Sequence, residues 1–192
     1  MAIQMYVDSL TVMLLALAAS SAMIAYFLVG TIRGKKDFAD LAPAGFMLAL
    51  FDFISGFYMS FFWPLPGPYN MLFGDPLLFL GMILLAGSFM LYKGFDIKIL
   101  SMLGVFLGIY LFAETYGMVA FNLEKGVDFL PAFGLYLLSA IAAVASPLVY
   151  LDTKSKNGRT AYYLLAIMFI LIAFIALFIG SAGIVAHLAS PP

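Results

Sequence analysis

Long apolar runs alternate with short polar segments along the whole chain. A helix that spans the hydrocarbon core of a bilayer needs roughly 20 mostly apolar residues. Six runs meet or approach this length, at about 10–32, 41–62, 76–92, 99–121, 130–151 and 161–187. Because the segments between them are short, successive helices should lie antiparallel to each other. The pattern predicts an all-α fold, a polytopic membrane bundle of six transmembrane helices that forms one integral membrane domain over residues 1–192.

The composition indicates that this bundle is surrounded by lipid. Of the 192 residues, 65% are hydrophobic and only 10% are charged, and the mean hydropathy is +1.11. A soluble domain carries about 25% charged residues, so this chain has too few polar groups to cover a globular surface. We therefore expect its partner to be the lipid bilayer and its location to be the cell (plasma) membrane, as a multi-pass protein.

The basic residues predict the orientation. Eight of the nine lie in the first, third and fifth connectors: Arg33, Lys35, Lys36, Lys93, Lys98, Lys154, Lys156 and Arg159. The ninth, Lys125, lies in the fourth connector beside Glu124. The positive-inside rule places the connectors that are rich in lysine and arginine in the cytoplasm. Both termini are then predicted to be extracytoplasmic.

Several classes of function are disfavoured by what the chain lacks. It has no cysteine and one histidine, His187, which disfavours disulfides, thiolate sites and multi-histidine metal sites. A net charge of −1 offers no basic surface for nucleic acid. Because no charged region precedes the first apolar run, we interpret that run as a retained helix and not as a signal peptide. No phosphate-loop, dinucleotide, zinc-protease or serine-elbow motif is present, so we expect no cofactor, no metal and no enzyme.

The second connector, 63–75, is stiff and uncharged until its last residue. Its candidate functional residues are Trp63, Pro64, Pro66, Pro68, Tyr69, Asn70 and Asp75. The aromatic rings suit the membrane interface, and each proline removes an N–H donor that would be unpaired near lipid. Asp75 followed by Pro76 predicts a capped helix start. The connector is either a packed lid or a re-entrant loop that gates or lines an outer cavity.

The same stretch carries a family resemblance. WPLPGPYNMLFGDPLLFLG, together with the aromatic-rich helix before it, resembles a family of small archaeal and bacterial membrane proteins catalogued as domain of unknown function 981. The resemblance extends over nearly the whole chain. It implies a polytopic prokaryotic membrane protein, and it supplies no activity and no functional residues.

Two acidic residues lie inside predicted spans, where a carboxylate costs about 3 kcal/mol on insertion scales and usually marks a site. Asp52 shares a helical face with Gly45, Ala49 and Gly56, and this face of small residues should turn toward the bundle interior. Glu114 lies in the fourth helix, on a different face from the Gly104-x-x-x-Gly108 pair. The candidate translocation or binding residues are Asp52, Glu114, Tyr110 and Tyr116. Alternatively, Asp52 is a protonated packing residue that hydrogen-bonds a neighbouring helix.

These residues support more than one function. The first hypothesis is translocation of a proton, a small cation or a hydrophobic solute through a site with intramembrane acids. A hydrophilic solute would find few polar partners in the spans. The alternative is a non-catalytic membrane subunit of a larger, respiratory-type complex, and a homo-oligomer also stays open. An intramembrane enzyme would depend on Asp52, Glu114 and tyrosines alone.

Overall fold

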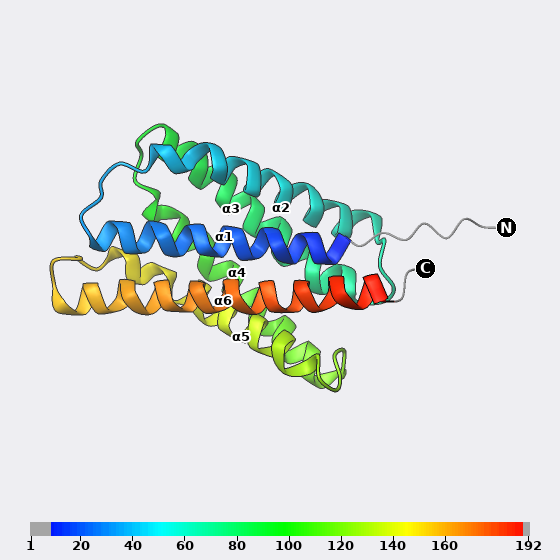
Figure 1. Cartoon of the computed structure of the whole chain (residues 1–192). Helices are drawn as coiled ribbons and strands as arrows, with labels where there is room; N and C mark the ends of the chain where they lie inside the picture. The colour runs from blue at the N-terminus through cyan, green and yellow to red at the C-terminus, as the bar shows by residue number, and fades with distance from the viewer. Residues whose placement is uncertain (1–8, 190–192) are drawn as a thin grey trace.

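Six long α-helices form a bundle in the computed structural model, which describes residues 9–189 (Figure 1). The helices are α1 (Ser9–Ile32), α2 (Ala42–Phe62), α3 (Asp75–Tyr92), α4 (Leu100–Ala120), α5 (Phe129–Val144) and α6 (Lys156–Ala189). Within the described range there is no β-strand, and six helical segments are long and apolar enough to cross a membrane. The predicted all-α six-helix bundle is confirmed, and it indicates a multi-pass membrane protein.

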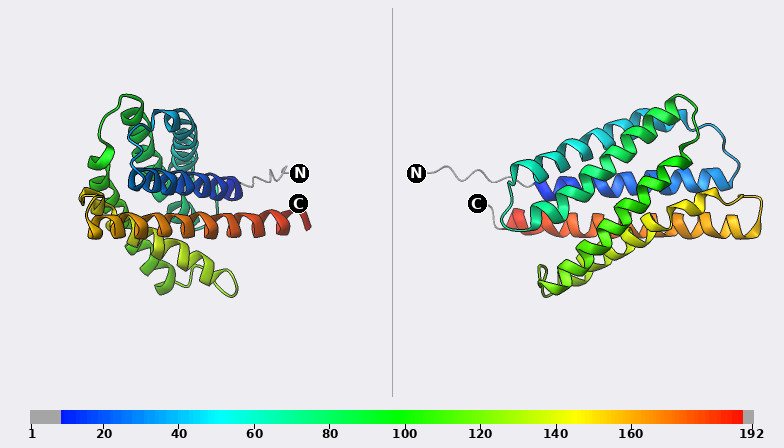
Figure 2. Two further views of the ribbon diagram at one scale, coloured as in Figure 1. Left: turned by 60° about the vertical axis from the view of Figure 1, so that its left-hand side comes forward. Right: turned by 180° about the vertical axis from the view of Figure 1, so that it is seen from behind.

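The helices pack as three close antiparallel pairs. α1 lies beside α6, α2 beside α3, and α4 beside α5, as the opposite views in Figures 1 and 2 also show. Looser contacts join α1 to α2, α3 to α4 and α5 to α6. The helices therefore form a ring in chain order, and the contact between α1 and α6 closes it.

The two ends of the bundle differ in charge. The first, third and fifth connectors lie together at one end with the first turn of α6, and this end holds eight of the nine basic residues (Figure 1). We call this the basic end. The second and fourth connectors lie at the opposite end, with the start of α1 and the end of α6. The termini themselves, residues 1–8 and 190–192, are outside the described residues.

Some helix limits differ from the predicted ranges for local reasons. A π-helix, Asn70–Gly74, leads directly into α3, so helical structure begins before the predicted start at residue 76. The α-helical part of α5 ends at Val144, and a 3₁₀ segment with Pro147 near its start, Ser146–Tyr150, follows. α6 extends over 34 residues, about 51 Å at 1.5 Å per residue. That length exceeds the hydrocarbon thickness, so α6 must tilt or project beyond it.

Glycines determine the closest helix contacts. A Cβ atom added to Gly81 of α3 would lie 2.5 Å from the backbone nitrogen of Phe53, and one added to Gly56 of α2 would overlap the backbone of Leu78. On α4, a Cβ at Gly108 would lie 2.7 Å from the backbone nitrogen of Val144, at the end of α5. Only hydrogen side chains permit these approaches.

Candidate functional site

Asp52 is completely buried, with an exposed fraction of 0%. Its neighbours on the predicted stripe, Gly45, Ala49 and Gly56, are buried as well, so this face of α2 turns inward as the sequence predicts. Ser20 of α1 donates a hydrogen bond from its hydroxyl to Asp52 Oδ2 at 2.9 Å. The other carboxyl oxygen, Oδ1, is buried and has no hydrogen-bond partner. Asp52 thus links α1 to α2 and keeps one acceptor position open.

Glu114 belongs to a second polar cluster, at the opposite end from the basic connectors. Tyr110, one turn earlier on α4, donates its hydroxyl to Asp75 Oδ2 at 2.7 Å. The carboxyl group of Asp75 lies close enough to interact electrostatically with Glu114. Both carboxyl oxygens of Glu114 are buried, and the nearby Tyr110 hydroxyl, which is directed to Asp75, is the group closest to satisfying them. The Asp75–Tyr110–Glu114 cluster therefore joins α3 to α4 through two acids and a tyrosine.

Asp75 differs from its predicted role as a helix cap. α3 begins at Asp75 without any side-chain capping hydrogen bond. The physical reason is that Asn70–Gly74 is already helical, so the first N–H groups of α3 find acceptors in the preceding turn. The carboxylate is thereby left to accept the hydrogen bond from Tyr110. The prediction of a capping carboxylate at this position was wrong.

For the tyrosines near the acids, the sequence singled out Tyr116, which lies elsewhere, and missed Tyr136. Tyr116 is 74% exposed and lies on the outside of the bundle, away from the acids. Tyr136 of α5, which the sequence did not single out, is buried and interacts electrostatically with Glu114. Its hydroxyl donates to the backbone carbonyl of Leu72. A tyrosine within an apolar run carries no signal of such a contact, because the partner carbonyl is 64 residues away in the chain.

The two intramembrane acids do not meet. The hydrogen-bond partner of Asp52 comes from α1, whereas the polar groups around Glu114 come from α3, α4 and α5. No hydrogen bond or ion pair joins Asp52 to Glu114. In the described part of the chain, no group of three or more histidine, cysteine, aspartate or glutamate residues is arranged to hold a metal ion.

The 63–75 connector folds back over its end of the bundle. Asn70 is fully buried, accepts a hydrogen bond from the backbone N–H of Leu65 at 2.8 Å and donates to the carbonyls of Leu65 and Gly67. Leu65 in turn packs against a core cluster that includes Met59 and Leu77. The three prolines are exposed. Asn70 and Leu65 therefore hold the connector down, and the prolines contribute stiffness.

A further contact joins this connector to the fourth. Tyr69 donates its hydroxyl to the backbone carbonyl of Leu123 at 2.9 Å. Burial, with a smaller contribution from Glu124, raises the pKa of Tyr69. Burial and the neighbouring Asp128 likewise raise the pKa of Glu124. The opposite end of the bundle thus carries several acidic groups in partly desolvated surroundings.

A cavity of about 650 Å³ lies among the helices. All six helices contribute to its lining, α2 only through its first turns, and most of the lining side chains are apolar. The cavity extends from Lys36 and Lys98 at the basic end to Phe73 and Pro76 near the other end. Neither Asp52 nor Glu114 lines it. Its polar lining consists mainly of hydroxyl groups, from Ser21, Thr31, Ser88, Ser101, Tyr136, Ser139, Ser146 and Tyr162.

Comparison with protein families agrees with the resemblance carried by the connector. The family model described as "Protein of unknown function (DUF981)" matches residues 1–190. The chain belongs to this family. No curated protein and no solved structure matches the chain. Membership of DUF981 brings no activity with it, so the function of this DUF981 protein has to be argued from its own cavity and acids.

Proposed function

We propose that this DUF981 protein binds a hydrophobic solute in its central cavity and carries it within the membrane. The observation that supports this proposal is the cavity of about 650 Å³ with a mostly apolar lining. Small-molecule sites are typically concave, mostly apolar and roughly 300–1,000 Å³ in volume. A hydrophilic solute would meet only scattered hydroxyl groups along most of this cavity. Of the three cargoes that the sequence allows, a hydrophobic solute is the best supported.

Filling the cavity tests this proposal. Leu84 of α3 lines the cavity, whereas the adjacent Leu85 does not. A neutral long-chain alcohol that carries a photoreactive diazirine should label cavity residues of the protein in nanodiscs, as mapped by peptide mass spectrometry. Leu84→Trp should remove most of this labelling because the indole occupies the space of the probe, while Leu85→Trp should leave it intact. Labelling confined to the outer surface, or equal in both variants, would contradict the proposal.

The acids support a second candidate function, the binding of a proton or a small cation. The observation in its favour is that Asp52 Oδ1 is a buried acceptor without a hydrogen-bond partner and that both oxygens of Glu114 are buried. A buried acceptor without a partner costs free energy, and protonation or a bound cation would remove that cost. Asp52 and Glu114 belong to separate clusters, so each would act as its own site, with Tyr110 and Asp75 assisting Glu114.

A subunit role in a larger membrane complex is the remaining alternative. Many large apolar side chains on the outer faces are exposed, among them Phe61, Phe106 and Phe174, and these suit either lipid or a protein partner. The mass of the natively extracted protein separates the two. The mass of one chain plus its detergent would contradict the subunit role, and a much larger assembly that contains other chains would support it.

The proposal includes the orientation of the bundle in the membrane. We place the basic end in the cytoplasm and the 63–75 connector outside, in a prokaryotic plasma membrane, because eight of nine basic residues lie at the basic end. The chain has no cysteine, so single cysteines can be labelled without background. In intact cells an impermeant maleimide should label Val127→Cys, at a position that is 88% exposed. It should label Ser155→Cys only after permeabilisation. The reverse pattern would overturn the orientation.

A further inference from the structure

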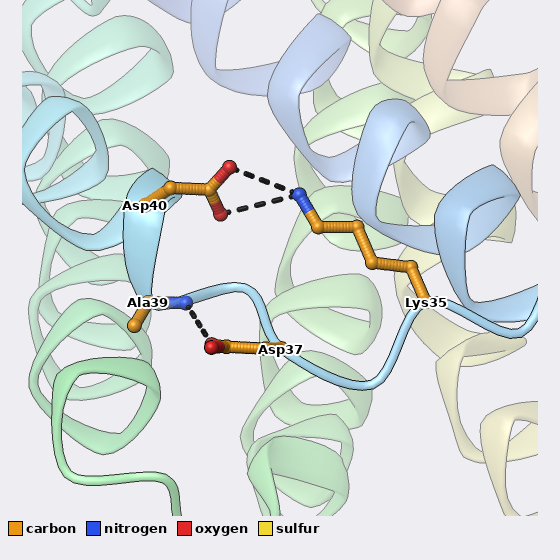
Figure 3. Close-up of polar contacts among 4 residues, drawn as sticks. All are labelled: Lys35, Asp37, Ala39 and Asp40. Atoms are coloured by element: carbon orange, nitrogen blue, oxygen red, sulfur yellow. Dashed lines mark hydrogen bonds and ion pairs between the residues drawn. The ribbon is translucent and has the colours of Figure 1, made fainter.

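The cavity has a charged margin at the basic end. Three lysines line it there, Lys35, Lys36 and Lys98, and the acidic residue among its lining residues is Asp96. Lys35 is already engaged, because its Nζ atom lies 3.2 and 3.0 Å from the two carboxyl oxygens of Asp40 (Figure 3). The bond to Asp40 raises the pKa of Lys35. This ion pair secures the first connector at the margin of the cavity.

The other two lysines, Lys36 and Lys98, form few polar contacts within the described residues. No hydrogen bond or ion pair of Lys36 is found there, and the nearest acid to Lys98 is Asp96, with 4.0 Å between Nζ and Oδ2. The opposite oxygen of Asp96 accepts a hydrogen bond from the backbone N–H of Lys98. This end of the cavity therefore offers the ammonium group of Lys36 and that of Lys98, whose ion pair with Asp96 is long, at 4.0 Å.

A hydroxyl group inside the cavity provides an independent observation. Ser101 lies in the first turn of α4, lines the cavity and is only 9% exposed. Its Oγ atom is buried and has no hydrogen-bond partner. Lys98 lies in the short 3₁₀ segment Ile97–Ile99 directly before α4, three residues ahead of Ser101, and both residues line the cavity. The positive end of the α4 dipole points toward the same margin, where it favours an anion.

We propose that the solute is a single-chain amphiphile with an anionic headgroup, bound with its head at Lys36, Lys98 and Ser101. Lysine donors and the serine hydroxyl suit a carboxylate or a phosphate monoester. The apolar tail then lies along the cavity toward Phe73 and Pro76. On α1 the lining extends from Leu10 to Thr31, about 31 Å of helix at 1.5 Å per residue, which accommodates an extended chain. This inference rests on the proposed function, because it names the solute of the same cavity.

Native mass spectrometry of the protein in a neutral maltoside detergent tests the headgroup. Oleate, oleyl phosphate and oleyl alcohol serve as probes that share one tail. We expect one oleate or one oleyl phosphate per chain, with oleyl alcohol at least about tenfold weaker because it lacks the charge. The double variant Lys36→Gln/Lys98→Gln should weaken both anions about tenfold and leave the alcohol unchanged. Lys93→Gln is the matched control, because Lys93 lies in the same connector as Lys98 but does not line the cavity.

Ser101→Ala separates binding from folding. Because the Ser101 hydroxyl has no partner in the protein, its removal should leave the thermal midpoint unchanged or higher, yet it should weaken anion binding. Ser146→Ala is the structural control, since Ser146 donates to the carbonyls of Ser101 and Ala143 and its loss should lower the midpoint. Equal affinity for alcohol and anions, or an unaffected lysine double variant, would overturn the headgroup assignment while the cavity labelling still stands. If neither anion binds and the neutral diazirine probe also fails to label the cavity, the proposed function itself is overturned.

Discussion

Gly56→Ala is expected to lower the stability of the bundle strongly. A Cβ atom at this position would overlap the backbone of Leu78 in α3 and would lie 2.8 Å from the carbonyl oxygen of Gly74. Backbone atoms cannot move aside as the end of a flexible side chain can, so α2 and α3 would have to separate. Overpacking of this kind costs about 3 kcal/mol or more, measurable as a fall in the thermal midpoint in detergent.

The chain offers a matched control for this change. Gly134 is also helical, in α5, and a Cβ atom there would meet nothing within 4 Å. Gly134→Ala should raise stability by about 0.5–1 kcal/mol, because alanine loses less backbone entropy on folding than glycine does. Gly81→Ala, on the other side of the same helix contact, should resemble Gly56→Ala. Equal midpoints for Gly56→Ala and Gly134→Ala would show that α2 and α3 are not as close as described.

Asp52→Asn is expected to abolish proton or cation flux while the protein stays folded, if Asp52 is the site of the second candidate function. The asparagine oxygen can still accept the hydrogen bond from Ser20, so the link between α1 and α2 is preserved, but the side chain can no longer ionise. Flux is measured in proteoliposomes with a trapped pH-sensitive dye under an imposed membrane potential. The variant should fall to the level of empty liposomes at the same protein yield.

Asp52→Leu isolates the structural contribution. It removes the acceptor and leaves the buried hydroxyl of Ser20, which is 0% exposed, without its partner at Asp52. This should cost about 1–3 kcal/mol of unfolding free energy. Ser20→Ala is the control from the other side of the bond and should lose at least as much, because it leaves both carboxyl oxygens of Asp52 buried without a hydrogen-bond partner. Wild-type flux in Asp52→Asn, combined with lower stability in Asp52→Leu, would make the acid a packing residue and would remove the main support for ion translocation.

The number and type of the elements, and the inward face of α2, could be predicted from single stretches of sequence. Length and hydropathy predict six helices because every backbone group in lipid must be satisfied within its own helix. The small residues around Asp52 predict its inward face, and the structure buries all of them. Glu114 lies on a different face of α4 from Gly108: the glycine packs against α5, whereas the acid interacts with Asp75 of α3 and Tyr136 of α5. Such properties belong to single segments and can be read from one stretch of chain.

Which segments meet depends on the packing of the whole bundle in three dimensions. Residues far apart in the chain form the contact of α1 with α6 and the lining of the cavity. The same is true of the hydrogen bonds from Tyr110 to Asp75 and from Tyr136 to the carbonyl of Leu72. No hydrophobic driving force selects partners between helices in lipid, so association depends on shape complementarity and on a few hydrogen bonds. Even at Asn70, where the partners are near in sequence, the amide closes the connector only because the neighbouring backbone has the matching conformation. Hydropathy is a sum over one segment, whereas complementarity is a property of two surfaces together, and for that reason the bundle could be predicted and its cavity could not.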